Sequence, residues 1–116
     1  MIDTHSHIYC DAFDEDRAAV VERAQQAGVS HVILPNENLA SLPLLQRMHE
    51  QFPCYTSLAI GLHPEEVKPD YREELDAMSA MLDSGDFVAV GEIGMDLYWD
   101  KTYRAEQMEA LKIQLT

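Results

Sequence analysis

Short apolar runs alternate along this chain with longer segments in which apolar residues return every three or four positions. The short runs are typical of buried strands, whereas the longer spacing is typical of amphipathic helices that bury one face. The expected strands cover residues 1–5, 29–34, 54–60 and 87–90, and a helical segment follows each of them.

Local signals mark where the first and third helices begin and end. Asp14 is a suitable N-cap for the first helix, and Gly28 is a natural residue to follow its last turn. Asp70 and Glu73 have the spacing of a capping-box variant at the start of the third helix, which we expect Gly85 to end.

The same spacing predicts which residues each helix turns inward. The second helix, which starts near Ser41 and Pro43, is expected to bury Leu44, Leu45, Met48 and Phe52. The third helix is expected to bury Leu75, Met78 and Leu82. One face of the last helix is expected to carry Arg104, Met108, Leu111 and Leu115.

The alternation of strands and helices predicts an α/β fold with four consecutive βα units and a parallel sheet covered by helices. We expect residues 1–116 to form a single domain, as this length favours. No stop signal follows the last helix at Leu115 and Thr116, so we expect this domain to be truncated.

The charge of the chain is strongly one-sided, with a formal net charge of −13. Such a field repels a phosphate backbone, which argues against sequence-independent binding of nucleic acid through a basic surface. It does not argue against metal-assisted phosphate chemistry, because a bound divalent cation reverses the charge locally.

The cysteines and the apolar runs bear on the compartment. Cys10 and Cys54 lack the spacing of a disulfide framework or a zinc knuckle, and no segment resembles a leader or a membrane span. We therefore expect a cytoplasmic protein with reduced thiols and no membrane partner.

Candidate functional side chains follow the ends of the predicted strands: His5, His7, His63, Glu92 and Asp96. The carboxyl ends of parallel strands meet at one edge, where active sites of parallel α/β folds lie. Because His5 and His7 are two residues apart on an extended segment, both imidazoles project to one face and can chelate a metal ion. The alternative for this pair is a polar cap on the sheet edge.

Each of the later candidates also has an alternative explanation. Glu92 lies between glycines that permit close backbone approach, and is either a metal ligand or general base, or a partner in a structural salt bridge. His63, in a turn restricted by Pro64, either donates to a phosphate, orients a ligand or is bonded locally. Asp96 either supports the metal ligands without binding the ion itself, or caps the turn that follows it.

The remaining histidines and aromatic residues have simpler explanations. His31 lies early in a strand and His49 lies on a helix, so both are expected to be structural. Tyr98, Trp99 and Tyr103 form either a stacking surface for a base or ring, or a group that closes the core. We favour closure of the core.

Three motifs occur in order along the chain: Asp3-Thr4-His5-Ser6-His7, Gly61-Leu62-His63-Pro64 and Gly91-Glu92-Ile93-Gly94-Met95-Asp96. Together they resemble the TatD family of metal-dependent deoxyribonucleases, within the amidohydrolase-like barrels. The resemblance covers the whole chain. It implies a (β/α)₈ TIM barrel that hydrolyses phosphodiester bonds, commonly those of DNA from the 3′ end, with one or two divalent ions.

The resemblance also implies roles for individual residues. His5 and His7 would be metal ligands, and Glu92 would be a catalytic residue and a ligand that bridges where two ions bind. His63 would contact the phosphate of DNA or of another phosphodiester substrate. Mixed histidine and carboxylate ligands suit Mg²⁺, Mn²⁺ or Zn²⁺.

The family pattern continues with two histidines and an aspartate that this chain does not contain. A full barrel takes about 250 residues, so we expect the N-terminal half of one, whose activity alone is not assured. Two other functions stay open: an amidohydrolase-like hydrolase of small molecules, and a non-catalytic half barrel that serves as an assembly or metal-binding module.

A half barrel leaves strand edges unpaired and apolar surface uncovered, and both features promote self-association. We therefore expect a dimer or a larger assembly. In a two-fold dimer, Glu92 would approach His5 and His7 of the second copy and rebuild a metal site.

Overall fold

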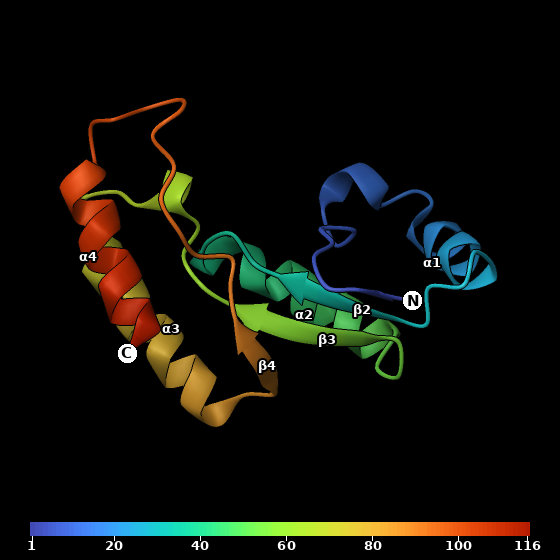
Figure 1. The fold of residues 1–116 in the computed structure, drawn as a ribbon. Helices are drawn as coiled ribbons and strands as arrows, with labels where there is room; N and C mark the ends of the chain where they lie inside the picture. The colour runs from blue at the N-terminus through green and yellow to red at the C-terminus, as the bar shows by residue number, and fades with distance from the viewer.

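Four parallel strands form one sheet in chain order, β1-β2-β3-β4, in a computed structural model that describes residues 1–116. The strands are β1 (Ile2–Asp3), β2 (His31–Pro35), β3 (Thr56–Ile60) and β4 (Phe87–Val90). They alternate with the helices α1 (Arg17–Gln26), α2 (Leu42–Gln51), α3 (Tyr71–Ser84) and α4 (Arg104–Leu115) (Figure 1). The predicted α/β fold with four consecutive βα units is confirmed.

The first strand is shorter than predicted: it ends at Asp3, before the histidine pair. The Asp3 carboxylate accepts the backbone N–H of His5 at 3.0 Å, which takes that N–H out of the sheet ladder. The chain returns to the sheet only where the Ser6 N–H donates to the Ile33 carbonyl oxygen at 3.2 Å. His5 and His7 therefore lie on an irregular segment above the sheet edge.

Helix α1 begins at Arg17 with Asp16 at its N-cap, so the predicted cap at Asp14 is wrong. The Asp14 carboxylate instead accepts from the Arg17 guanidinium at 2.8 Å. The same guanidinium donates to the carbonyl oxygens of Ile8 and Cys10 at 2.8 and 2.7 Å, which anchors the segment after the histidine pair. Beyond the helix, Gly28 has a φ of 90°, as expected of a residue that follows a last turn.

The predicted capping box at Asp70 is also wrong. Asp70 occupies the N-cap position of α3, but its side chain makes no capping hydrogen bond. A capping box forms instead at the short 3-10 helix η2 (Leu39–Ser41), between Asn38 and Ser41. Gly85 follows the last residue of α3, as predicted.

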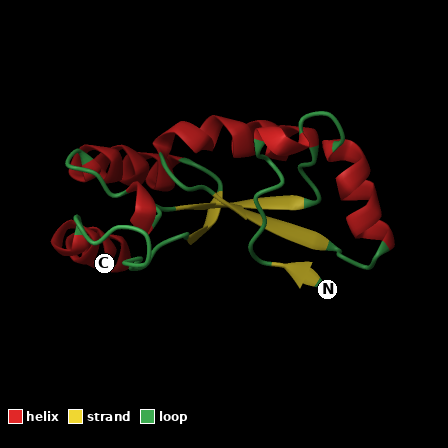
Figure 2. Cartoon of the chain, turned by 90° about the horizontal axis from the view of Figure 1, so that it is seen from above, coloured by secondary structure: helices red, strands yellow, loops and turns green.

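A core of apolar side chains lies between the sheet and the helices, which gather along one face of the strands (Figure 2). Leu45 and Met48 of α2 are buried in it as predicted, whereas Leu44 is 36% exposed and Leu42 is buried in its place. On α3, Leu75 and Met78 are buried but Leu82 is 36% exposed; the fully buried side chains include Leu34, Leu42, Leu45, Leu62 and Val67. No helix combines the length and the apolar character that a membrane crossing needs.

The face predicted for α4 is wrong, because polar contacts decide which side of this helix is buried. Gln107 and Ala110 are buried, whereas Met108 and Leu115 are 45% and 70% exposed. The Gln107 amide accepts the Asp96 N–H and donates to the Asp96 carbonyl oxygen, both at 2.9 Å. A helix face that holds a loop in this way does not follow apolar periodicity.

Two further amide side chains hold the loop after β3. The Asn36 carbonyl oxygen accepts the Gly61 N–H at 2.7 Å, and the Asn36 amide donates to the Asn38 carbonyl oxygen at 2.9 Å. From α4, the Gln114 side chain accepts the Leu62 N–H at 2.7 Å. These bonds pair backbone groups that lie past the end of the sheet, at the edge where the predicted site residues lie.

We predict that Asn36→Ala lowers the free energy of unfolding by about 1–3 kcal/mol, because it leaves the buried Gly61 N–H without a partner. Urea denaturation followed by circular dichroism measures this change. The matched control is Gln26→Ala, which removes an exposed amide whose partner is Glu22 on the same helix. Equal stabilities of the two variants would contradict the structural role of Asn36.

The prediction of self-association stays a prediction, now tied to the two outer strands of the sheet. β1 and β4 each have one unpaired edge, and Ile2, Val88 and Val90 are 59%, 61% and 41% exposed. We expect a second copy to cover this apolar surface, because uncovered strand edges favour pairing with another chain. Light scattering at micromolar concentration would show a dimer or larger species, and a well-folded monomer would contradict this expectation.

Candidate metal centre

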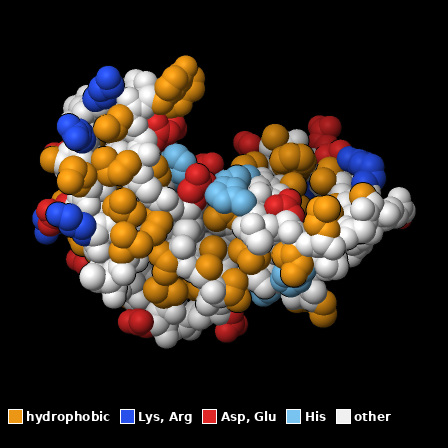
Figure 3. All heavy atoms as spheres, in the orientation of Figure 1, with side chains coloured by type: hydrophobic (Ala, Val, Ile, Leu, Met, Phe, Trp, Pro, Cys, Tyr) orange, Lys and Arg blue, Asp and Glu red, His pale blue; other side chains and the backbone are white.

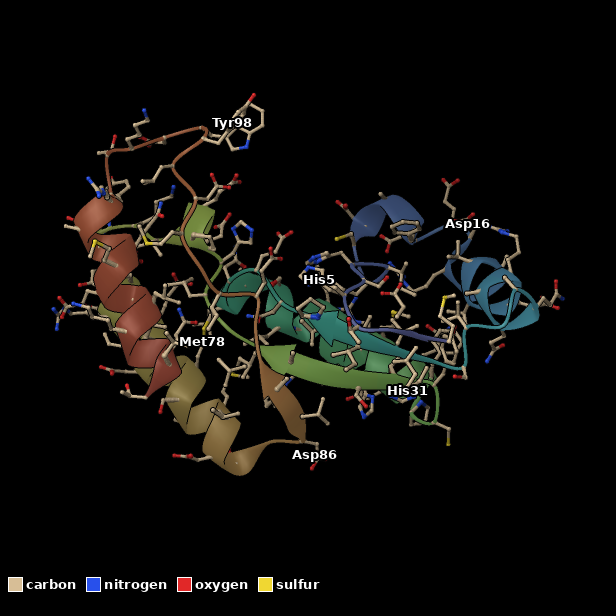
Figure 4. The ribbon with its side chains drawn as sticks, viewed as in Figure 1. His5, Asp16, His31, Met78, Asp86 and Tyr98 are labelled. Carbon is tan, nitrogen blue, oxygen red and sulfur yellow. The ribbon has the colours of Figure 1, made fainter.

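Three side chains from the segments that follow the two outer strands meet above the C-terminal edge of the sheet. The Nε2 atoms of His5 and His7 lie 3.1 Å apart. The Glu92 Oε2 atom lies 2.9 Å from His5 Nε2 and 3.6 Å from His7 Nε2. In the space-filling view, histidine and acidic side chains lie at the floor of a hollow between two raised parts of the molecule (Figure 3). His5 points into this region from the N-terminal segment (Figure 4).

The arrangement fits a divalent cation. Two imidazole nitrogens and one carboxylate oxygen are suitable donors, and all three lie within 4.8 Å of one another. Ligand atoms at tetrahedral positions around Zn²⁺ are about 3.3 Å apart when the bonds are about 2.0–2.1 Å. The observed separations of 2.9, 3.1 and 3.6 Å bracket that spacing. Two neutral imidazoles and a carboxylate also give the cation a compensating negative charge.

A buried tyrosine fixes which nitrogen of His7 faces this cluster. The Tyr9 hydroxyl donates to the Pro35 carbonyl oxygen at 2.7 Å, so its proton is committed. Its oxygen then accepts from His7 Nδ1, which lies 2.7 Å away. A proton on Nδ1 leaves the lone pair on Nε2, the atom that faces His5 and Glu92. Supporting bonds of this kind orient the histidines that ligate metals.

Burial and a nearby carboxylate keep the Tyr9 hydroxyl protonated, so it continues to donate to the Pro35 carbonyl oxygen. Its side chain is only 2% exposed, and burial, aided by the nearby Glu37 carboxylate, raises the pKa of the Tyr9 hydroxyl. The hydroxyl therefore stays protonated at neutral pH and keeps the Pro35 bond. Glu37 itself lies just past β2, with Oε1 3.8 Å from His7 Nδ1.

Glu92 reaches the histidines with one carboxylate oxygen while the other faces His63. Glu92 Oε1 lies 3.3 Å from His63 Nε2, and His63 Nδ1 accepts the Glu65 N–H at 3.1 Å. The proton of His63 is therefore on Nε2, the nitrogen directed at Glu92. The backbone of Glu92 is close to β3 as well: a Cβ added at Gly61 would lie 3.1 Å from the Glu92 carbonyl oxygen.

Four of the five residues predicted for the site are thus brought together: His5, His7, His63 and Glu92. Asp96 is the exception, because its carboxylate Oδ1 accepts the Tyr98 N–H at 2.9 Å, in agreement with the alternative of a turn-capping acid. His31 and His49 bond to the hydroxyls of Ser57 and Thr56, as structural residues would.

Tyr9 and Glu37 were not predicted from the sequence, although each carries a signal. Tyr9 follows His7 by the same two-residue interval that separates the two histidines, and Glu37 follows a predicted strand as the other candidates do. The expectation that Tyr98 and Trp99 close the core is wrong, since they are 81% and 76% exposed.

The three ligands meet within one chain, and the dimeric arrangement expected for the cluster stays a prediction. Glu92 was expected to approach the histidines of a second copy, yet it meets His5 and His7 of its own chain. The segments that follow β1 and β4 both leave the sheet at the same edge (Figure 1), and their side chains meet there. No second chain is needed to assemble these three ligands.

Known proteins share this fold. Residues 2–116 match the family described as TatD related DNase. The chain is 34% identical to the 3′-5′ ssDNA/RNA exonuclease TatD of Citrobacter koseri, covering 99% of this chain and 44% of that protein. It is 28% identical to the uncharacterized metal-dependent hydrolase YabD of Bacillus subtilis, covering 99% of this chain and 45% of that protein.

A solved structure confirms the predicted architecture. The crystal structure of YjjV, a TatD homologue from Escherichia coli K12, superposes with a TM-score of 0.88 at 32% identity, over 99% of this chain and 45% of that one. The four βα units therefore match part of a TatD TIM barrel, and the chain spans about 45% of the length of that relative. On the strength of the match over residues 2–116, the chain belongs to the family of TatD-related DNases.

Proposed function

We propose that this chain carries metal-binding residues of a hydrolase that cleaves phosphodiester bonds in single-stranded nucleic acid from the 3′ end. The observation that carries the proposal is the convergence of His5, His7 and Glu92 on one point. The names of two relatives support it, since YabD is called a metal-dependent hydrolase and the Citrobacter protein a 3′-5′ ssDNA/RNA exonuclease. The chain covers only 44–45% of the length of these relatives. That this chain is itself catalytically active is therefore also a proposal.

The residues of this chain would divide the work between holding a cation and placing the substrate. His5, His7 and Glu92 would hold Mg²⁺, Mn²⁺ or Zn²⁺, one or two ions in all. Such a cation lowers the pKa of bound water and stabilises the negative charge that develops on the phosphoryl oxygens. Tyr9 keeps the lone pair of His7 directed at the cluster.

His63 is the residue that links the cluster to the substrate in this proposal. Its Nε2–H faces Glu92 Oε1 at 3.3 Å and would orient that carboxylate. The imidazole is also partly exposed at the hollow, so the same N–H would donate to a phosphate oxygen when substrate is present. Its backbone is held in place, because the His63 N–H donates to the Glu37 carbonyl oxygen at 2.8 Å.

We predict that the chain binds Mn²⁺ or Zn²⁺ at the three-residue cluster, and that His5→Ala and Glu92→Gln each weaken binding by at least roughly tenfold to a hundredfold. That range applies even to supporting partners of metal ligands, and these substitutions remove ligands themselves. Isothermal titration calorimetry measures the affinities. His31→Ala is the control, because His31 bonds to Ser57 at the opposite end of the sheet.

A Tyr9→Phe variant distinguishes binding of a metal ion at the three-residue cluster from diffuse attraction of cations to the acidic surface. It keeps all three ligands but removes the hydroxyl that holds the His7 tautomer, so we expect affinity to fall by roughly tenfold to a hundredfold. Identical weak binding by the wild type, His5→Ala and Glu92→Gln would instead show diffuse attraction of cations to an acidic chain.

We predict metal-dependent removal of nucleotides from the 3′ end of single-stranded DNA, abolished by Glu92→Gln and weakened through a higher KM by His63→Ala. Gel analysis of a 5′-labelled oligonucleotide with added Mg²⁺ or Mn²⁺ measures this activity. Hydrolysis of small phosphoesters alone would favour the small-molecule hydrolase, whereas metal binding without any hydrolysis would favour the non-catalytic module.

A further inference from the structure

Two large aromatic side chains stand in solvent on the loop that joins β4 to α4. Tyr98 and Trp99 are 81% and 76% exposed, and their rings pack edge to face with centroids 4.6 Å apart. Figure 4 places Tyr98 at the tip of this loop, on the side of the molecule toward which His5 points. Burial of one such side chain removes 150–250 Å² from water, so leaving both exposed forgoes a large stabilisation.

The loop that carries this pair is held in place by hydrogen bonds. The Asp96 carboxylate accepts the Tyr98 N–H at 2.9 Å, and Gln107 bonds both backbone groups of Asp96 at 2.9 Å. After the pair, the Asp100 carboxylate accepts from the Thr102 hydroxyl and, at 2.8 Å, from the Thr102 N–H, and these two bonds lower the pKa of that carboxyl. The aromatic rings are therefore presented from a fixed backbone.

We propose that Tyr98 and Trp99 form a platform on which nucleobases of a single-stranded nucleic acid stack. This inference rests on the proposed function, because the same loop carries Glu92 of the metal cluster. Exposed aromatic rings bind unpaired bases through their faces, and this contact tolerates any sequence because every base offers such a face. A strand stacked on the pair would extend from the loop tip toward the hollow that holds the metal ligands.

The charges around the platform indicate that contacts with bases, rather than with phosphates, supply its affinity for single-stranded nucleic acid. The pocket beside Trp99 is lined by three acidic residues, Glu65, Asp96 and Asp100, with Lys68 as its basic residue. Lys68 is engaged already, since its ammonium donates to the Glu65 carbonyl oxygen at 3.0 Å and lies 5.7 Å from the Tyr103 ring centroid. Binding should therefore depend on salt less steeply than binding through phosphate contacts does.

Trp99 is the single tryptophan of the chain, so its fluorescence reports the platform directly. We expect a short oligothymidylate or oligouridylate to quench this fluorescence, and an abasic strand of equal length to have no effect. The titration is done in EDTA, so that it does not depend on the metal cluster. Tyr98→Ala should weaken binding about fivefold or more, whereas Tyr98→Phe, which keeps the ring, should bind like the wild type.

Three results would overturn the platform. Absence of quenching by base-bearing strands would show that the rings bind no bases, and equal quenching by the abasic strand would show phosphate binding. A fluorescence change with protein concentration alone would show that a second copy covers the pair. Because metal binding and hydrolysis are measured separately, a failure here is distinguishable from a failure of the proposed function.

Discussion

The constraint on which the rest of the structure depends is the pairing of backbone groups where the chain leaves the parallel sheet. Beyond the strand ends, buried N–H and carbonyl groups have no ladder partners and must be satisfied by other means. Amide side chains supply those partners: Asn36 bonds to Gly61, Gln107 to Asp96, and Gln114 to Leu62. These contacts fix the loop after β3 to the segment after β2, and they fix the loops after β3 and β4 to α4.

Fixed loops allow the two outer strands to build one site. Four strands spaced about 4.8 Å apart place the outer pair about 14 Å from each other in a flat sheet. The ligand atoms of His5 and Glu92 are nevertheless 2.9 Å apart, so side chains of the segments after β1 and β4 meet over this edge. Gly61 permits the close approach on the β4 side, where an added Cβ would lie 2.9 Å from Ile93 Cγ2. The Arg17 guanidinium holds the segment after β1 from its other end.

Sequence predicted well those features that follow from local periodicity, and poorly those that follow from tertiary hydrogen bonding. The apolar run of β4 and the placement of His5, His7, His63 and Glu92 at strand ends could be predicted because parallel strands carry functional groups at one edge. The buried face of α4 could not, since it is chosen by the polar contact of Gln107.

The role of Tyr9 and the exposure of the aromatic pair needed the structure for related reasons. Tyr9 fixes the tautomer of His7 because its own proton goes to the Pro35 carbonyl oxygen, a partner 26 positions away in the chain. Tyr98 and Trp99 are large aromatic residues, which usually lie in a core. Only the path of their loop in the structure shows that they face solvent.

The central claim is that one chain assembles a metal site from His5, His7 and Glu92. The most direct test is a crystal structure of the protein grown with Zn²⁺, with diffraction recorded on both sides of the zinc absorption edge. The account predicts an anomalous peak bonded to the Nε2 atoms of both histidines and to the Glu92 carboxylate of the same chain. Zinc bound elsewhere, or bonded to Glu92 of one chain and the histidines of another, would contradict it.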